Sequence, residues 1–82
     1  MQPALRLDQL PLATSATIQD VDWTALGDDG RRLRNLGFDE GVRVTPLHKG
    51  PIGADPLAVR VGRMTVAIRR AHARAVAVAV AN

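Results

Sequence analysis

Apolar residues alternate with other residues at every second position in three stretches of the second half of the chain, 57–61, 64–68 and 76–80. This period places one face of a β-strand on a core, so each stretch is predicted to be a strand. The last stretch is rich in alanine, which favours helix, but helical spacing would scatter its valines around the axis. We therefore predict a strand there, with an alanine face that must meet the early helix, the lead segment or another chain.

Turn residues separate these stretches. Gly62 and Arg63 lie between two alternating runs, and glycine at the first central position is typical of a type II′ hairpin. The four residues 70–73 leave room for one tight turn before the last strand. A further strand is predicted at 42–47, followed by an irregular Gly/Pro-rich connection over 49–56.

The first half of the chain has weaker alternation. The lead segment 5–12 is interrupted by Pro11 and is predicted to be extended. A strand is predicted from Ser15 to Trp23, but Ile18 and Val21 are an odd number of residues apart. A β-bulge between them would bring both side chains to the same face.

A short helix is predicted to end at a specific corner. Residues 26–36 contain a Gly/Asp-rich loop that supplies an Asp cap, followed by about two helical turns. With Gly37 as the left-handed residue after the helix, Leu33 and Phe38 become the pair that touches in a Schellman motif. Gly41 then redirects the chain into the next strand.

These elements predict one mainly β domain over residues 1–82. About five strands with one short early α-helix and no long crossover helix imply antiparallel pairing by hairpins. A small, partly open barrel is the closure that leaves the fewest exposed edges. Only 2% of the residues are aromatic and none is cysteine, so the core must be built from aliphatic side chains without disulfides or thiolate metal sites.

The net charge of +3 is modest and is carried almost wholly by arginines. These arginines are spread over several predicted elements, whereas a nucleic-acid footprint is denser, so no nucleic acid is expected as a partner. The sequence has no apolar run long enough to span a membrane and no signal peptide, which predicts a cytoplasmic protein.

Candidate chemistry is sparse. Ser15, His48 and His72 share no spacing that would unite a nucleophile with a base, so we expect no enzymatic activity and no required cofactor. His48 and His72 are the candidate metal ligands, although they form no HxH or HxxxH cluster. Two chains brought together as a homodimer could share a weakly bound zinc or ferrous ion through them.

The ordered series of motifs resembles the FeoA family. It includes Leu7-Asp8-Gln9-Leu10-Pro11, the helix corner with Leu36-Gly37 and Gly41, Asp55-Pro56, and Ala67-Ile68-Arg69-Arg70. The resemblance implies an SH3-like barrel that serves bacterial ferrous iron transport, with the membrane transporter FeoB and its cytosolic GTPase domain as partner. Two positions depart from the family pattern: Ala13 replaces a common glycine, and His72 replaces a usual glutamate.

We hypothesise that the barrel docks on FeoB through the apolar residues Leu33, Phe38 and Ile52, with Arg31 and Arg34 steering it toward an acidic surface. One alternative is a stand-alone module like the SH3-like C-terminal domain of metal-dependent repressors. The other alternative is a small basic nucleic-acid-binding barrel, whose affinity would fall steeply with added salt.

Overall fold

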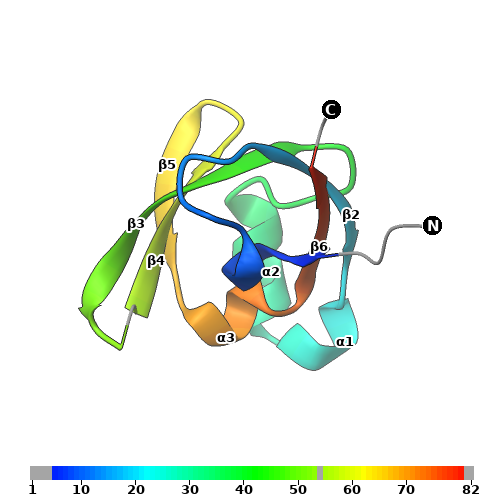
Figure 1. Ribbon diagram of the computed structural model, residues 1–82. Coiled ribbons are helices and arrows are strands. Elements are labelled where there is room, and N and C mark those ends of the chain that lie inside the picture. The colour runs from blue at the N-terminus through cyan, green and yellow to red at the C-terminus, as the bar shows by residue number, and fades with distance from the viewer. Residues whose placement is uncertain (1–4, 54, 81–82) are drawn as a thin grey trace.

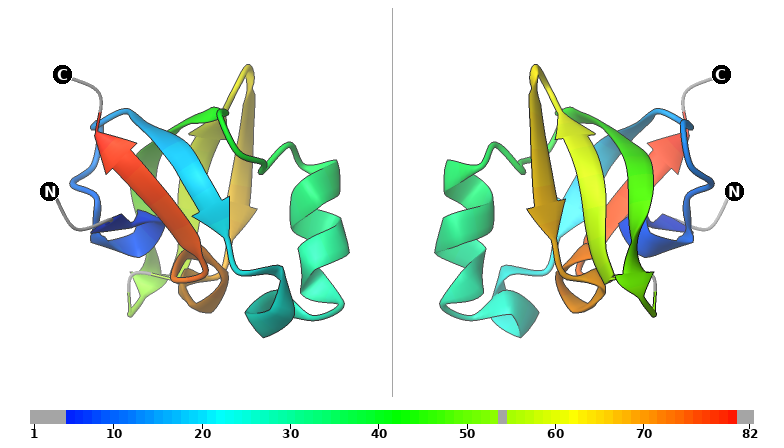
Figure 2. Two further views of the ribbon diagram at one scale, coloured as in Figure 1. Left: turned by 90° about the vertical axis from the view of Figure 1, so that its right-hand side faces the viewer. Right: turned by 90° about the vertical axis from the view of Figure 1, so that its left-hand side faces the viewer.

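The computed structural model describes residues 5–53 and 55–80 of the 82-residue chain. Its strands form one curved antiparallel sheet around a single core, in the order β1-β6-β2-β3-β4-β5 (Figures 1 and 2). The sheet is a partly open barrel whose two edges are β1 and β5. The strands are β1 (Leu5–Arg6), β2 (Ala16–Val21), β3 (Arg43–Ile52), β4 (Asp55–Val61), β5 (Met64–Ile68) and β6 (Val76–Val80).

The helices within the described ranges are all short. A 3₁₀ helix follows β1, two α-helices follow β2, and one α-helix connects β5 to β6. They are η1 (Leu7–Gln9), α1 (Trp23–Leu26), α2 (Asp29–Asn35) and α3 (Arg70–Ala73). Across the described residues, no helix has the length and apolar character that crossing a membrane requires.

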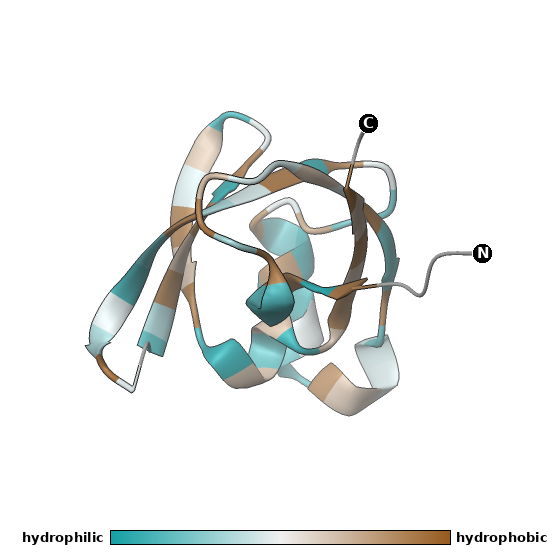
Figure 3. Ribbon diagram, in the orientation of Figure 1, coloured by the Kyte–Doolittle hydropathy of each residue, from teal (hydrophilic) through white to brown (hydrophobic). Residues whose placement is uncertain are grey.

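The three alternating stretches form strands, as predicted. Val61 pairs with Met64 across the two-residue turn, where Gly62 has φ +57° and Arg63 keeps a negative φ, which is the combination of a type II′ turn. The terminal Ala/Val segment forms β6, which lies between β1 and β2. Its ribbon is coloured as hydrophobic along its length (Figure 3). Ala75 and Ala77 are buried, so the alanine face is covered within the chain.

The predicted bulge is present in β2, whose pairing with β6 shifts register between Ile18 and Asp20. The shift brings Ile18 and Val21 into the same core. The strand ends earlier than expected, because the Asp22 carboxylate accepts a hydrogen bond from the amide of Ala25 at 3.0 Å and so begins α1 at Trp23. The side-chain cap predicted next to α2 is absent: Asp28 occupies its N-cap position without such a bond.

The prediction of an irregular connection after residue 47 was wrong. β3 continues through Pro51 to Ile52 and pairs with β4 as far as Asp55. Beyond Val44, β3 pairs only with β4. Its prolines, Pro46 and Pro51, can therefore be accommodated, because a residue paired on one side only does not have to donate an N–H to a second strand. A side chain at Gly50 would collide with the Asp55 carbonyl, so glycine permits this close approach of the two strands.

The Schellman corner is confirmed. The amide of Phe38 donates to the Leu33 carbonyl at 3.1 Å, and the amide of Gly37, with φ +105°, donates to Arg34 at 3.0 Å. The amide of Gly41 then donates to the carbonyl of Ile18 at 2.8 Å, which attaches the corner to β2. The corner therefore fixes where α2 stands relative to the sheet.

The lead segment is not simply extended. It supplies the two-residue strand β1, which pairs with β6, and the 3₁₀ helix η1, whose Leu7 is completely buried. This segment raises the strand count to six among the described residues, against about five predicted.

Ala13 has a left-handed backbone with φ +68°, and among the described residues it is the one non-glycine residue with positive φ. Its amide donates to the Pro46 carbonyl at 2.7 Å, and this hydrogen bond ties the loop before β2 to β3. The left-handed conformation costs an alanine about 1 kcal/mol or more, whereas glycine adopts it freely. This geometry explains why glycine is the favourable residue at this position.

We expect Ala13→Gly to raise the free energy of unfolding by about 1 kcal/mol, because it removes this backbone penalty. Urea unfolding followed by circular dichroism measures the change. Ala25→Gly is the control, because Ala25 is an exposed residue of α1 with ordinary helical backbone, and its replacement should destabilise the protein by about 0.5–1 kcal/mol. Equal loss of stability in both variants would contradict a left-handed Ala13.

Candidate functional site

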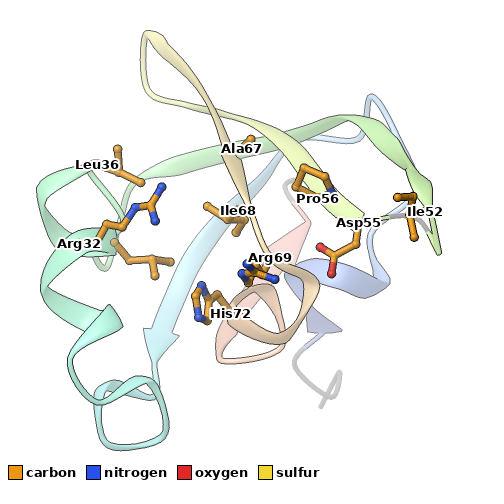
Figure 4. A pocket seen from close by; sticks show the side chains of 10 residues that line it. Arg32, Leu36, Ile52, Asp55, Pro56, Ala67, Ile68, Arg69 and His72 are labelled. Carbon is orange, nitrogen blue, oxygen red and sulfur yellow. The ribbon is translucent and has the colours of Figure 1, made fainter.

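A groove of about 480 Å³ lies between α2 and the C-terminal end of β5 (Figure 4). Its apolar surface comes from four parts of the fold: α2 and the residue after it, the end of β3, the beginning of β4, and the end of β5. The residues are Leu33, Leu36, Ile52, Pro56, Ala67 and Ile68. An apolar surface between a helix and a strand is a typical place for a ligand or a peptide to bind.

The polar residues of the groove are mostly basic. Arg32 extends from α2 on one side, whereas Arg69 and His72 lie at the end of β5 and in α3. Neither guanidinium has a carboxylate within ion-pair distance among the described residues. Asp55 is the one carboxylate in the lining. The groove therefore combines an apolar surface with two available positive charges.

Asp55 has a structural partner. Its Oδ1 accepts a hydrogen bond from the backbone amide of Arg70 at 3.0 Å, at the beginning of α3. The Arg70 guanidinium in turn donates to the carbonyl of Gly53 at 3.0 Å. These two bonds join α3 to the end of the β3–β4 hairpin, which explains the Asp55-Pro56 motif as part of the framework of the groove.

His72 joins α3 to α2. Its Nε2 lies 3.1 Å from Oδ2 of Asp29, the first residue of α2. His72 thus contacts a carboxylate of the neighbouring helix. In this structure His72 therefore links α3 to α2.

Arg31 and Arg34 lie on a different face of α2 from Arg32. The Arg34 guanidinium is 4.4 Å from the centre of the Trp23 ring, a cation–π contact. Both arginines line a second, smaller hollow of about 260 Å³ beside Trp23. The structure therefore separates the predicted steering arginines from the groove that contains Ile52.

Two of the residues predicted to contact a partner are buried in this structure. Phe38 is completely buried and Leu33 is 1% exposed, because the Schellman corner directs both side chains into the core. Phe38 therefore offers no surface to a partner, and Leu33 only underlies the groove. Ile52, in contrast, is 81% exposed at the end of β3 and borders the groove.

The predicted metal ligands lie on different elements. His48 is an exposed residue of β3, and His72 belongs to α3. Over residues 5–53 and 55–80, no group of three or more histidine, aspartate or glutamate side chains is placed to hold a metal ion. Ser15, the candidate nucleophile, shares a 2.8 Å hydrogen bond with the Thr45 hydroxyl rather than with a histidine.

The sequence analysis missed Arg69 and the groove role of Arg32. Arg32 and Leu36 are four residues apart and so share one face of the helix, which was a usable signal. Nothing in the sequence indicated that this face stands opposite the end of β5, because the corner at Gly37 and Gly41 sets that relation through tertiary contacts.

We expect Asp55→Ala to lower the free energy of unfolding by about 1 kcal/mol, because the amide of Arg70 loses its acceptor. Asp55→Asn is the matched variant, since its side-chain oxygen can still accept that bond, and it should lose less than half as much. Thermal unfolding of the two variants and the wild type measures the difference. Equal losses would show that this hydrogen bond does not stabilise α3.

Comparison with known proteins places the fold. The FeoA domain family model matches residues 5–80. A search of curated protein sequences found no match. Among solved structures, FeoA of Stenotrophomonas maltophilia in complex with zinc, described as a prokaryotic SH3 domain protein, is 44% identical. That comparison has a TM-score of 0.78 and covers 93% of this chain and 91% of the other.

Two further structures show the range of the fold. FeoA from Chlorobium tepidum is 27% identical with a TM-score of 0.84, covering 95% of this chain and 71% of that one. IdeR from T. acidophilum is 21% identical with a TM-score of 0.78, covering 99% of this chain but only 37% of IdeR. The second likeness concerns the fold alone.

The predicted SH3-like architecture is thus confirmed by an antiparallel barrel that superimposes on solved FeoA proteins. The family match covers nearly the whole described chain, and the 44% identical relative covers almost as much. The chain therefore belongs to the FeoA family of proteins associated with ferrous iron transport.

Proposed function

We propose that this chain is a non-enzymatic, cytoplasmic accessory protein of bacterial ferrous iron uptake that docks on the cytosolic part of a FeoB-type transporter. The FeoA match over residues 5–80 is the observation that carries this proposal. The fold adds to it, because a small SH3-like barrel with an apolar, basic groove is suited to binding another protein.

The distribution of reactive groups supports a role without catalysis. Ser15 is hydrogen-bonded to Thr45, and His72 contacts Asp29. Nucleophilic or acid–base catalysis requires such groups to converge on one substrate position. The groove instead offers apolar surface and guanidinium groups, which recognise a partner without changing it covalently.

The proposed docking uses Ile52 beside the groove together with Arg31 and Arg34, which lie on another face of α2. Ile52 supplies an exposed apolar anchor, and burying such a side chain contributes roughly 1.5–3 kcal/mol. Arg31 and Arg34 provide long-range attraction to an acidic surface, which accelerates encounter more than it strengthens the final complex. Leu33 and Phe38 contribute indirectly, by holding α2 in place from the core.

Binding should be measured by pull-down and by titration calorimetry with the cytosolic part of the FeoB-type transporter from the same organism. Ile52→Asp should weaken binding about tenfold, because a carboxylate replaces the apolar anchor. Arg34→Glu should mainly slow association at low salt. Leu12→Asp is the control for Ile52→Asp, because Leu12 is an exposed leucine in the loop before β2.

Unchanged binding in both Ile52→Asp and Arg34→Glu would remove this surface from the proposal. Absence of binding by the wild-type chain would contradict the FeoB partnership itself. In cells, deletion of the gene should change the rate of ferrous iron uptake, and the sign of that change shows whether docking activates or restrains the transporter.

We propose that a divalent metal ion binds only weakly and is not needed for folding. The zinc complex of the Stenotrophomonas maltophilia protein is consistent with weak binding of zinc or ferrous ion through His48 or His72. A homodimer could complete such a site with ligands from two chains.

Removal of metal with EDTA should therefore leave the midpoint of thermal unfolding unchanged. Zinc titration by calorimetry, with and without His48→Ala and His72→Ala, identifies the ligands of any ion that binds. A large drop in the unfolding midpoint after chelation would contradict this proposal, because a structural metal contributes its binding free energy to folding.

The fold shared with part of T. acidophilum IdeR favours one alternative. In that alternative the chain acts in trans as a regulatory module on a metal-dependent repressor. Capture of a repressor, rather than the transporter, by the wild-type chain would distinguish this role. Affinity for operator DNA or RNA that falls steeply with salt would instead indicate the nucleic-acid-binding alternative.

A further inference from the structure

β5 presents an open edge beside the groove. It pairs only with β4, and it stands between β4 and α2 in both side views (Figure 2). In a two-residue hairpin the closing pair, Val61 and Met64, exchanges hydrogen bonds, and the bonded pairs then alternate along the strand. The backbone groups of Thr65 and Ala67 therefore point away from β4, toward the groove side.

These outward groups have no backbone partner among the described residues. The backbone hydrogen bonds outside the sheet ladders involve none of the residues 64–68. Both Thr65 and Ala67 are exposed, and Ala67 also lines the groove. Exposed backbone groups of this kind are available to a partner strand.

The edge lacks the usual protection against such pairing. Exposed edges in soluble proteins are commonly short, bulged, or protected by lysine or proline. β5 contains neither residue, and it keeps an unbroken register with β4 over five residue pairs. The opposite edge, β1, is only two residues long. The sheet thus has one edge that can accept another strand.

The charges beside this edge select the partner. Arg32 lies across the groove on α2, and Arg69 follows directly after β5, so the two guanidiniums flank the path that an added strand would take. Neither has an ion-pair partner among the described residues, and the nearby carboxylate of Asp55 is engaged by the Arg70 amide. The apolar side chains of Leu36 and Ile68 line the same groove.

From this arrangement we infer that an extended acidic segment of the partner adds to β5 as a further strand in the groove. Its backbone pairs with Thr65 and Ala67, its carboxylates meet Arg32 and Arg69, and an apolar side chain packs on Leu36 and Ile68. This inference rests on the proposed function for the identity of the partner. The recognition of an acidic strand follows from the residues of the groove alone.

Synthetic peptides test the recognition independently of the transporter. The probe is a heptapeptide of alternating glutamate and leucine, and the control is the same peptide with lysine in place of glutamate. In ¹⁵N-labelled protein, the acidic peptide should shift the amide signals of 65–69 and of α2, whereas the lysine peptide should not. Shifts confined to other elements, or equal shifts with both peptides, would overturn the inference.

Two kinds of variant identify the contacts. Ala67→Pro removes the outward N–H while leaving the β4 ladder intact, and it should weaken binding of the acidic peptide about five- to tenfold. Ala67→Ser keeps the N–H and should bind like the wild type. Arg32→Glu and Arg69→Glu should each weaken binding about tenfold. The charge control Arg63→Glu, at the far end of the hairpin, should have little effect.

Equal binding by Ala67→Pro and Ala67→Ser, in variants whose spectra show the native fold, would overturn strand addition. If Ala67→Pro does not fold, the variants Arg32→Glu and Arg69→Glu still test the inference. A dimer in sedimentation that Ala67→Pro dissociates would overturn the inference in favour of self-association of β5. A negative peptide result leaves the transporter pull-down unaffected, so failure of this inference is distinguishable from failure of the proposed function.

Discussion

The corner between α2 and β3 is the constraint on which the rest of the structure depends. Gly37 takes a backbone conformation that side chains disfavour, and this lets the amide of Phe38 return to the carbonyl of Leu33. The same turn buries both side chains in the core, while Gly41 bonds to β2. The core holds the C-terminal end of α2 through Leu33 and Phe38. The helix therefore stands beside β5, and a groove lies between the two elements.

Local patterns were sufficient to predict most of the elements. Alternation identified β4, β5 and β6, and the odd spacing of Ile18 and Val21 predicted the bulge in β2. The length of β3 could not be predicted in this way, because its second half contains Pro51 and Gly50 and depends on pairing with β4. Local composition indicated a loop, and a tertiary partner stabilised a strand instead.

The candidate site was less predictable than the fold. Leu33, Phe38 and Ile52 were all predicted as apolar contacts for a partner, but only Ile52 is exposed. Arg32 and Arg69 are far apart in sequence, and both line the groove only because the fold places α2 beside β5. Similar barrels occur in FeoA proteins and in part of T. acidophilum IdeR, so the barrel alone does not identify a function.

The position of β6 has a consequence for how the protein is made. This last strand of the described chain lies between β1 and β2, and it supplies fully buried valines to the core. The ribosome synthesises residues 76–80 after every other strand, so the nascent chain lacks the strand that joins β1 to β2 until they emerge from the exit tunnel. Productive folding is therefore expected only once synthesis has passed these residues, and until then the exposed edge of β2 must be kept from pairing with other chains.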